Sequence, residues 1–252
     1  MLTINKRLMA LKFKRALTTY DNEATIQQQM AEFLITNTTN KIGNNFSNLL
    51  EIGCGTGLLT KQILSKLEFK KLYVNDIVPD YKFFIQRKLS PHITFIPGDA
   101  ESITIFPTSL ELIISNATFQ WFHHLPETLL KLKNLLTSNG YLVFSTLGPD
   151  TFKEITQLTN IRLSYFSWDK IKEILQTNFE IIFSKQNILT RYFSVATQIL
   201  EHIKALGVNS LPKPIWSKKT LQTFKENYTK TFTTPYGLPL TYQPQYFILR
   251  SK

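Results

Sequence analysis

Short apolar runs alternate with segments of helical spacing along the first 150 residues. Residues 49–52 are mostly apolar and lead into a turn with three glycines, after which Leu and Ile recur at helical spacing over 58–67. Further strands are expected at 70–77 (ending at Asp76), 92–102 (ending near Asp99), 110–121 (opening into a loop at Ser115 and Asn116) and 141–150. Residues 126–140 are predicted to form a helix closed by Asn139 and Gly140. This alternation predicts a parallel sheet with helices on both faces.

Beyond residue 150 the pattern becomes less regular. Helices are expected at 151–158, 168–177, 194–206 and 217–231, and strand-like runs at 179–193 and 240–250. These segments either cover the sheet or extend it. No internal repeat and no long Gly/Ser linker interrupts the 252 residues, which predicts a single domain.

The composition narrows the classes of partner. Lys and Arg number 29 against 18 Asp and Glu, a net charge of +11 that favours nucleic acid, anionic lipid or an acidic protein. No apolar run approaches the roughly 20 residues of a membrane-spanning helix, so we expect a soluble protein with no membrane partner. The single cysteine excludes an internal disulfide and a cysteine-cluster metal site, and it favours a cytoplasmic location.

The glycine turn Gly53–Gly57 restricts the ligand. A dinucleotide fingerprint would need glycine at position 58, which is leucine, and the Gly-Lys-Ser/Thr ending of a phosphate-binding loop is absent. Glu51 would repel a pyrophosphate but would favour a cationic ligand. In open α/β sheets ligands bind beyond the carboxyl ends of the strands, where the turn falls together with Asp76, Asp99, Ser115 and Asn116.

The stretch LEIGCGTG at 50–57 resembles the first motif of the class I S-adenosylmethionine-dependent methyltransferases, and Asp76 resembles the acid that ends their second strand. The resemblance implies a doubly wound, mostly parallel, seven-stranded Rossmann-like α/β sheet with S-adenosyl-L-methionine as cofactor. It implies that Asp76 accepts hydrogen bonds from both ribose hydroxyls and that Asp99 binds the adenine amino group. The alternative is that both acids cap the helices that follow. The implied cofactor-binding residues are Glu51, Gly53, Gly55, Gly57, Asp76, Asp99, Ala100, Ser115 and Asn116.

Cys54, His123 and His124 are the other reactive side chains near these segments. No histidine is close to Cys54 in the sequence, and a tight turn favours small side chains, so we interpret Cys54 as a turn residue and not as a nucleophile. Adjacent histidines point apart, and no carboxylate–histidine set surrounds this pair. We therefore expect no metal site.

Segments outside the cofactor motif resemble, in order, the malonyl-[acyl-carrier-protein] O-methyltransferases of biotin synthesis. The narrowest matches are F-x-R-x-x-x-x-Y (Phe13, Arg15, Tyr20) and S-T-x-G-P-x-T over 145–151, and further similar segments lie at 115–121, 199–210 and 238–250. The resemblance implies a helical lid from residues 1–40, a cofactor-binding core over 41–150, and lid helices with the final strands over 151–252. It makes the basic N-terminus part of the domain, with a transit peptide as the alternative.

The implied reaction is methyl transfer to the free carboxylate of a malonyl thioester on acyl carrier protein. A carboxyl group with an ordinary pKa of about 4 is ionised at neutral pH, so no general base is needed. The protein must align the reacting atoms and remove water, and a neutral hydroxyl positions the carboxylate better than a guanidinium. Tyr20 is the candidate catalytic residue. The alternative is a half-buried tyrosine on a lid helix.

Five further residues are candidates for substrate or carrier contacts. Gln120 and Trp121 are expected to line the methyl-transfer pocket, with core packing as the alternative. Lys12, Arg15 and Lys204 are expected to contact the acidic helices of the carrier protein, and a solvated basic surface is the alternative.

Four other functions compete with this one, including modification of a protein by a reaction other than methylation on the same cofactor fold. A nucleic-acid methyltransferase is disfavoured, because residues 115–118 read Ser-Asn-Ala-Thr where amino-methylating enzymes carry an Asn/Asp-Pro-Pro-aromatic run, and the catalytic cysteine of cytosine-C5 enzymes is absent from that region. A methyltransferase of the same fold that acts on a quinone or another small molecule remains an alternative. A non-catalytic cofactor- or carrier-binding scaffold is the last, although it would not require the glycines, Glu51, Asp76 and Asp99.

Overall fold

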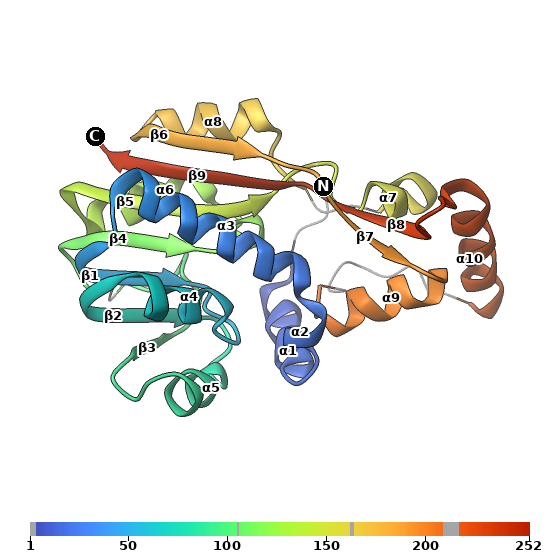
Figure 1. The fold of residues 1–252 in the computed structure, drawn as a ribbon, viewed down its shortest axis with the longest axis horizontal. Helices are drawn as coiled ribbons and strands as arrows, with labels where there is room; N and C mark the ends of the chain where they lie inside the picture. The colour runs from blue at the N-terminus through green and yellow to red at the C-terminus, as the bar shows by residue number, and fades with distance from the viewer. Residues whose placement is uncertain (1–3, 105, 162–163, 209–216) are drawn as a thin grey trace.

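A seven-stranded sheet forms the centre of the protein. The computed structural model describes residues 4–104, 106–161, 164–208 and 217–252. The strands are β1 (Asn45–Ile52), β2 (Glu68–Asp76), β3 (Thr94–Pro97), β4 (Leu110–Ser115), β5 (Leu136–Leu147), β6 (Phe179–Gln186) and β9 (Pro244–Ser251), in the order β3-β2-β1-β4-β5-β9-β6 (Figure 1). The first five run parallel, and β9 is antiparallel to β5 and β6. The predicted mostly parallel seven-stranded α/β sheet is confirmed.

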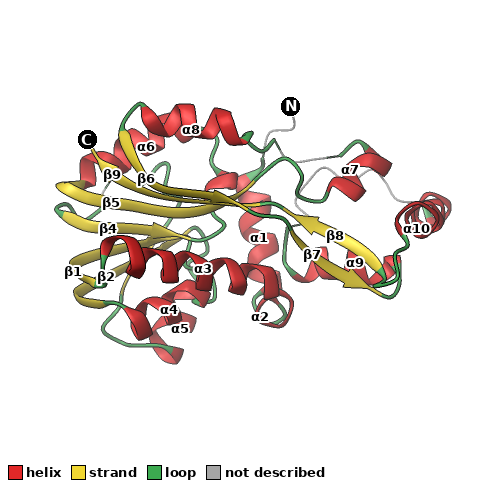
Figure 2. Cartoon of the chain, turned by 45° about the horizontal axis from the view of Figure 1, so that its top comes forward, coloured by secondary structure: helices red, strands yellow, loops and turns green. Residues whose placement is uncertain are grey.

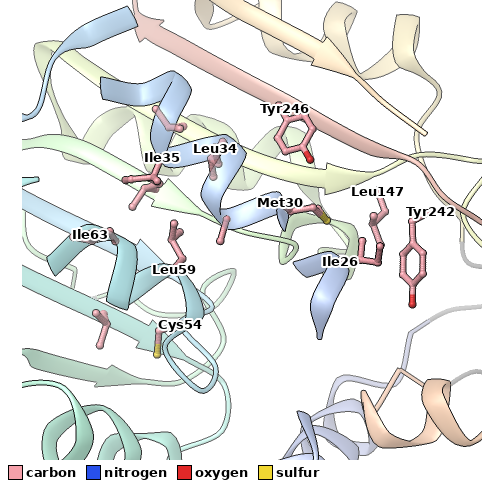
Figure 3. Close-up of a cluster of buried hydrophobic side chains, with 14 of the residues drawn as sticks. Ile26, Met30, Leu34, Ile35, Cys54, Leu59, Ile63, Leu147, Tyr242 and Tyr246 are labelled. Carbon is pink, nitrogen blue, oxygen red and sulfur yellow. The ribbon is translucent and has the colours of Figure 1, made fainter. Parts of the chain in front are cut away.

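Helices cover both faces of this sheet because successive strand residues point to opposite faces. In β4, Leu112 and Ile114 join one buried apolar cluster and Ile113 joins the other. One face is covered by α3 (Thr25–Ile42), α4 (Leu58–Lys66) and α5 (Tyr81–Lys88), and the other by α6 (Leu125–Leu135) and α8 (Trp168–Gln176). Figure 3 shows Met30 and Leu34 of α3 within the first cluster.

A second, two-stranded sheet extends beyond the end of the central one. It pairs β7 (Leu189–Phe193) with β8 (Leu238–Tyr242), and α7 (Lys153–Thr159), α9 (Ala196–Ala205) and α10 (Lys218–Phe232) lie around it (Figure 2). Each strand-like run expected in this region, 179–193 and 240–250, therefore divides into two strands that belong to different sheets. The part of the chain beyond residue 150 therefore covers the main sheet with α8 and also extends that sheet with β6 and β9.

Two short helices precede α3: α1 (Lys6–Ala16) and α2 (Tyr20–Glu23). The side chain of Asn5 starts α1 by accepting a hydrogen bond from Leu8 N at 2.9 Å. Because α3 packs on the main sheet, only α1 and α2 of the region 1–40 lie where a lid is expected. The division of the domain into lid and core stays a prediction. Among the described residues, no helix has both the length and the apolar character to cross a membrane.

The expected helix end at Asn139 and Gly140 is wrong. Helix α6 ends at Leu135, and both residues lie within strand β5. Leu136 pairs with Leu110 of β4 ahead of an irregularity in register, and a Cβ on Gly140 would lie 2.9 Å from Leu110 O. Gly140 is thus required by close approach to the neighbouring strand, a contact that the local Asn-Gly pattern does not reveal.

Candidate active site

The carboxyl ends of β1, β2 and β4 open into a pocket beneath α1 and α2, which we call the first hollow. Six of the predicted cofactor-binding residues line it: Gly53, Gly55, Asp76, Asp99, Ala100 and Asn116. Three do not, namely Glu51, Gly57 and Ser115. The edge of the sheet at which the sequence placed the ligand is therefore the edge that carries the hollow.

The glycine turn has a backbone that other residues adopt poorly. Gly53 has φ 71°, and a Cβ there would lie 2.1 Å from Thr118 Oγ1. Gly55 has φ 50°, but a Cβ there would meet nothing within 4 Å, since that side of the turn faces the first hollow. Asn75 O accepts hydrogen bonds from Gly53 N at 2.8 Å and Cys54 N at 2.9 Å. The turn is thus fixed to the end of β2 while its open side stays free for a ligand.

Asp76 holds the same turn through its carboxylate. Its Oδ2 accepts from Gly55 N at 2.8 Å and its Oδ1 accepts from Val78 N at 2.9 Å. Burial raises the pKa of Asp76 to about 6, although these backbone hydrogen bonds oppose the rise. The capping alternative is excluded for Asp76, because α5 begins only at Tyr81.

Glu51 lies in β1, two residues before the glycine turn, and is hydrogen-bonded to α4. Its Oε2 accepts a hydrogen bond from Thr60 Oγ1 at 2.6 Å. Burial raises the pKa of Glu51 to about 8, the Thr60 hydrogen bond lowers it, and nearby Asp76 raises it further. Burial thus favours the neutral form of Glu51, which joins β1 to α4, and its predicted role beside a cationic ligand stays a prediction. Burial also raises the pKa of the Cys54 thiol well above its ordinary value, which disfavours the nucleophilic thiolate.

Asp99 forms an ion pair that holds α1 over the first hollow. Lys6 Nζ lies 2.8 and 2.6 Å from the two Asp99 carboxylate oxygens, and it also pairs with Glu101. Glu101 in turn accepts hydrogen bonds from the backbone N–H groups of His123 and His124 at 2.9 and 2.7 Å. The role of Asp99 toward adenine stays a prediction, since Lys6 occupies one side of its carboxylate.

A second hollow adjoins the first, and the two share Phe13, Tyr20, Ala117 and Trp121 as lining residues. Three predicted site residues line it: Tyr20 at the start of α2, and Gln120 and Trp121 of the 3₁₀ helix η1 (Phe119–Trp121). Trp121 packs edge-on against Phe13 of α1, with ring centroids 5.5 Å apart. Tyr20 therefore stands at the boundary between the two hollows.

Polar contacts at both ends fix helix α2 and thereby Tyr20. Thr56 of the glycine turn donates to Asp21 Oδ1 at 2.5 Å. Glu23 pairs with Arg191 of β7 at 2.9 Å and with His202 of α9 at 2.7 Å. These contacts join α2 to the cofactor side and to the second sheet.

The predicted carrier-binding residues Lys12, Arg15 and Lys204 line neither hollow. They lie on α1 and α9, whose C-terminal ends meet: Thr19 Oγ1 donates to Ala205 O at 3.0 Å, and a Cβ on Gly207 would lie 3.0 Å from Lys12 O. The fold thus brings the helices that carry these bases side by side, next to the second hollow. Their role stays a prediction.

No group of three or more His, Cys, Asp or Glu residues is arranged for a metal ion in the described ranges. His123 Nε2 lies 2.8 Å from Ile4 O, so its ring contacts the backbone before α1.

The chain is similar to known methyltransferases over nearly its whole length. A family model described as "Methyltransferase domain" matches residues 50–144. The malonyl-[acyl-carrier protein] O-methyltransferase of Bacteroides thetaiotaomicron is 34% identical over 260 residues, which cover 99% of each chain. The protein of that name from Calditerrivibrio nitroreducens is 35% identical over 237 residues, 94% of each chain. The chain belongs to the malonyl-[acyl-carrier protein] O-methyltransferase family.

Solved structures place this family member among methyltransferases in fold. A putative methyltransferase from Bacillus halodurans has a TM-score of 0.62 at 11% identity, covering 86% of this chain and 96% of its own. The N-methyltransferase NodS from Bradyrhizobium japonicum, in complex with S-adenosyl-L-homocysteine, has a TM-score of 0.53 at 14% identity and covers 92% and 98%. At these identities the likeness shows the fold alone.

Several residues of this O-methyltransferase that line the hollows were not predicted as pocket residues, among them Asn75, Gln27 and Tyr165, and Lys6, which the basic N-terminus suggested only as a carrier contact. Asn75 could have been found from the sequence, because it immediately precedes Asp76 at a strand end. Its Nδ2 donates to Ile96 O and Gly98 O, both at 2.9 Å, and so fixes the loop after β3. The other three come from distant helices or loops and carry no local motif.

The raised pKa of Asp76 predicts a pH-dependent cofactor affinity. The ionised carboxylate accepts hydrogen bonds more strongly than the protonated acid, and its population falls as the pH drops through about 6. Between about pH 7.5 and about pH 5.5, the affinity for S-adenosyl-L-methionine should therefore fall roughly fourfold, in proportion to the ionised fraction. Calorimetric titration of the wild type and of Asp76→Asn, which cannot titrate, checks this. An equal pH dependence in both proteins would contradict the assignment.

Proposed function

We propose that the protein transfers the methyl group of S-adenosyl-L-methionine to the free carboxylate of malonyl-[acyl-carrier protein], an early step of biotin synthesis. The observation that carries the proposal is the junction of the two hollows at Tyr20, one lined by the glycine turn and Asp76, the other only by uncharged side chains. Full-length relatives of that name support the choice of substrate. A cytoplasmic location, without nucleic-acid or membrane partners, is part of the proposal.

The residues of the first hollow fit this cofactor. Gly55 leaves open space where a side chain would stand, which allows a ligand to approach the backbone. Asp76 retains acceptor capacity for the ribose, since a carboxylate has about four lone-pair sites and the backbone N–H groups that act on it are those of Gly55, Val78 and Ile77. When bound, S-adenosyl-L-methionine supplies an electrophilic methyl group on a positively charged sulfur.

The residues of this chain then have to place the nucleophile and exclude water. A malonyl carboxylate is ionised at neutral pH, so no proton has to be removed before it attacks. The Tyr20 hydroxyl, at the boundary of the hollows, donates to that carboxylate and aligns it with the first hollow. Met9 and Phe13 of α1 line the first hollow from the lid side and keep water from the reacting atoms.

An activity assay tests the proposal directly. Purified protein with S-adenosyl-L-methionine should form S-adenosyl-L-homocysteine when malonylated carrier protein is supplied and not with the unacylated carrier. Turnover of quinones or other small molecules alone would favour the alternative methyltransferase. Cofactor binding without turnover on any of these acceptors would favour a scaffold.

The acidic carrier is proposed to dock where α1 meets α9. Arg15 and Lys204 are exposed on these helices, and the chain has a net charge of +11. The charge reversal Arg15→Glu with Lys204→Glu should lower kcat/KM for malonyl-carrier by at least about tenfold, because attraction becomes repulsion at the contact. The wild-type kcat/KM should also fall steeply with salt, since the Debye length is about 8–10 Å near physiological ionic strength.

Two controls make this prediction specific. Lys218→Glu with Lys219→Glu changes the charge equally on the exposed start of α10, and it should have a much smaller effect. Malonyl-coenzyme A lacks the carrier surface, so the Arg15 and Lys204 reversal should affect its turnover far less. Equal losses on both substrates would assign these residues to the pocket or the fold.

A further inference from the structure

The second hollow contains polar side chains that the protein itself leaves without partners. Gln27, in the first turn of α3, is 6% exposed, and its Oε1 is buried with no hydrogen-bond partner. The hydroxyls of Tyr20 and Tyr165, which line the same hollow, make no hydrogen bond to any described residue. Buried polar groups are normally hydrogen-bonded, because burial without a partner costs the hydration that they lose. Of these three side chains Gln27 is buried, whereas Tyr20 and Tyr165 are partly exposed and line the same hollow with hydroxyls that have no partner among the described residues. Together they indicate a ligand that completes them.

The neighbouring amide side chains, Gln120 and Asn116, have hydrogen-bond partners within the protein, in contrast to Gln27. Gln120 donates from Nε2 to Ala117 O at 2.7 Å and accepts at Oε1 from Thr146 Oγ1 at 3.3 Å. Asn116 donates to the backbone oxygen of Gln27 at 3.0 Å and accepts from Ser145 Oγ at 2.6 Å. Gln120 therefore has its oxygen and one of its two amide N–H groups already bonded within the protein. Asn116 fixes the backbone at Gln27 but leaves its side chain unsatisfied.

The chemistry of the hollow selects the kind of ligand group. No charged residue lines it, so an anion inside would be held by neutral donors. Rotation of the Gln27 carboxamide by half a turn exchanges its oxygen and nitrogen, which directs N–H donors where the unpartnered oxygen stands. Neutral donors hold a carboxylate without cancelling its charge, which keeps the attacking oxygen nucleophilic.

We propose that Gln27 is a substrate-binding residue, and that with Tyr165 it donates hydrogen bonds to the malonyl carboxylate oxygen that is not methylated. This inference rests on the proposed function. Tyr20, at the boundary with the first hollow, contacts the oxygen that receives the methyl group. Methylation removes the negative charge, so the same donors hold the product ester less strongly and favour its release.

Gln27→Leu is the first test, because it removes the carboxamide with little change in volume. We expect kcat/KM for malonyl-carrier to fall about 10- to 100-fold, as for loss of a hydrogen bond to a charged group. Cofactor affinity should not change, and the melting temperature should stay equal or rise, since an unpartnered buried polar group is gone. A folding role would instead lower the melting temperature together with the activity.

Gln27→Glu provides a readout that a structural role would not move. An ionised glutamate repels the malonyl carboxylate, while burial raises the pKa of the glutamate and restores a neutral O–H donor at lower pH. With saturating cofactor, the activity of Gln27→Glu relative to wild type should therefore rise as the pH falls from about 8 to about 6. A ratio that is constant with pH would overturn the proposal.

Gln245→Leu is the matched control. Gln245 is also fully buried with an unpartnered Oε1, but it lies outside both hollows, so its replacement should leave kcat/KM within about twofold. Full activity of a folded Gln27→Leu would overturn the inference.

Binding of malonyl-carrier to protein loaded with S-adenosyl-L-homocysteine, measured by calorimetry, separates this inference from the proposed function. An inactive wild type with Gln27-dependent binding would overturn only the proposed function, and an active wild type with Gln27-independent binding only this inference.

Discussion

Replacement of Asp76 by Ala is expected to weaken S-adenosyl-L-methionine binding by roughly 2–4 kcal/mol, or about 30- to 1,000-fold. This loss of affinity has two causes. The ribose hydroxyls lose a charged acceptor, and Gly55 N loses the carboxylate that holds the glycine turn in place at 2.8 Å. Calorimetric titration of the purified variant measures the effect.

The control for this variant is Asp80→Ala. Asp80 is an exposed acid only four residues away, and its ion pair with Lys14 at 2.8 Å lies at the surface. Surface ion pairs contribute about 0–1 kcal/mol to stability, so cofactor affinity should stay within about twofold of wild type. Unchanged affinity in a folded Asp76→Ala protein would rule out the assignment of Asp76 to the cofactor.

Tyr20→Phe is expected to lower kcat on malonyl-carrier by about 10- to 100-fold, as for loss of a hydrogen bond to a charged group in the transition state. The substitution keeps the ring and removes only a hydroxyl that has no hydrogen-bond partner among the described residues. Cofactor affinity and melting temperature should therefore stay close to wild type. Steady-state kinetics with saturating cofactor, together with thermal unfolding, check both parts.

Tyr192→Phe is the matched variant for Tyr20. Tyr192 lies on β7, lines neither hollow, and is 45% exposed beside Tyr236. Loss of its hydroxyl should change neither kcat nor stability. If Tyr20→Phe behaves in the same way, Tyr20 has a packing role only.

The parts of the fold that the sequence predicted are those whose signals are local. The expected strands around β1, β2 and β4 lie close to the observed ones, because a buried parallel strand is a continuous apolar run. The four helices expected after residue 150 each match an observed helix to within a few residues. The divided strands at 179–193 and 240–250 were not foreseen, since an apolar pattern does not indicate which partner strand each half finds.

The residues of the candidate site also divide into those with a local signal in the sequence and those without one. The glycine turn and Asp76 were found because both follow directly from a strand in the sequence, and Tyr20, Gln120 and Trp121 because of a family resemblance. Six of the nine predicted cofactor residues line the first hollow. Of the segment 199–210 that carries part of the resemblance, residues 209 and 210 lie outside the described residues.

The sequence by itself determined the parallel sheet, the ligand-binding edge and the family, because strand pattern, turn glycines and motif spacing are written within a few consecutive residues. Only the tertiary structure decided that Lys6 pairs with Asp99 across 93 residues, and that Gln27 and Tyr165 meet Tyr20 around one uncharged hollow. Such contacts depend on which distant segments the packed helices bring together. A lysine or a glutamine on a helix face has the same local pattern whether it meets solvent or a binding site.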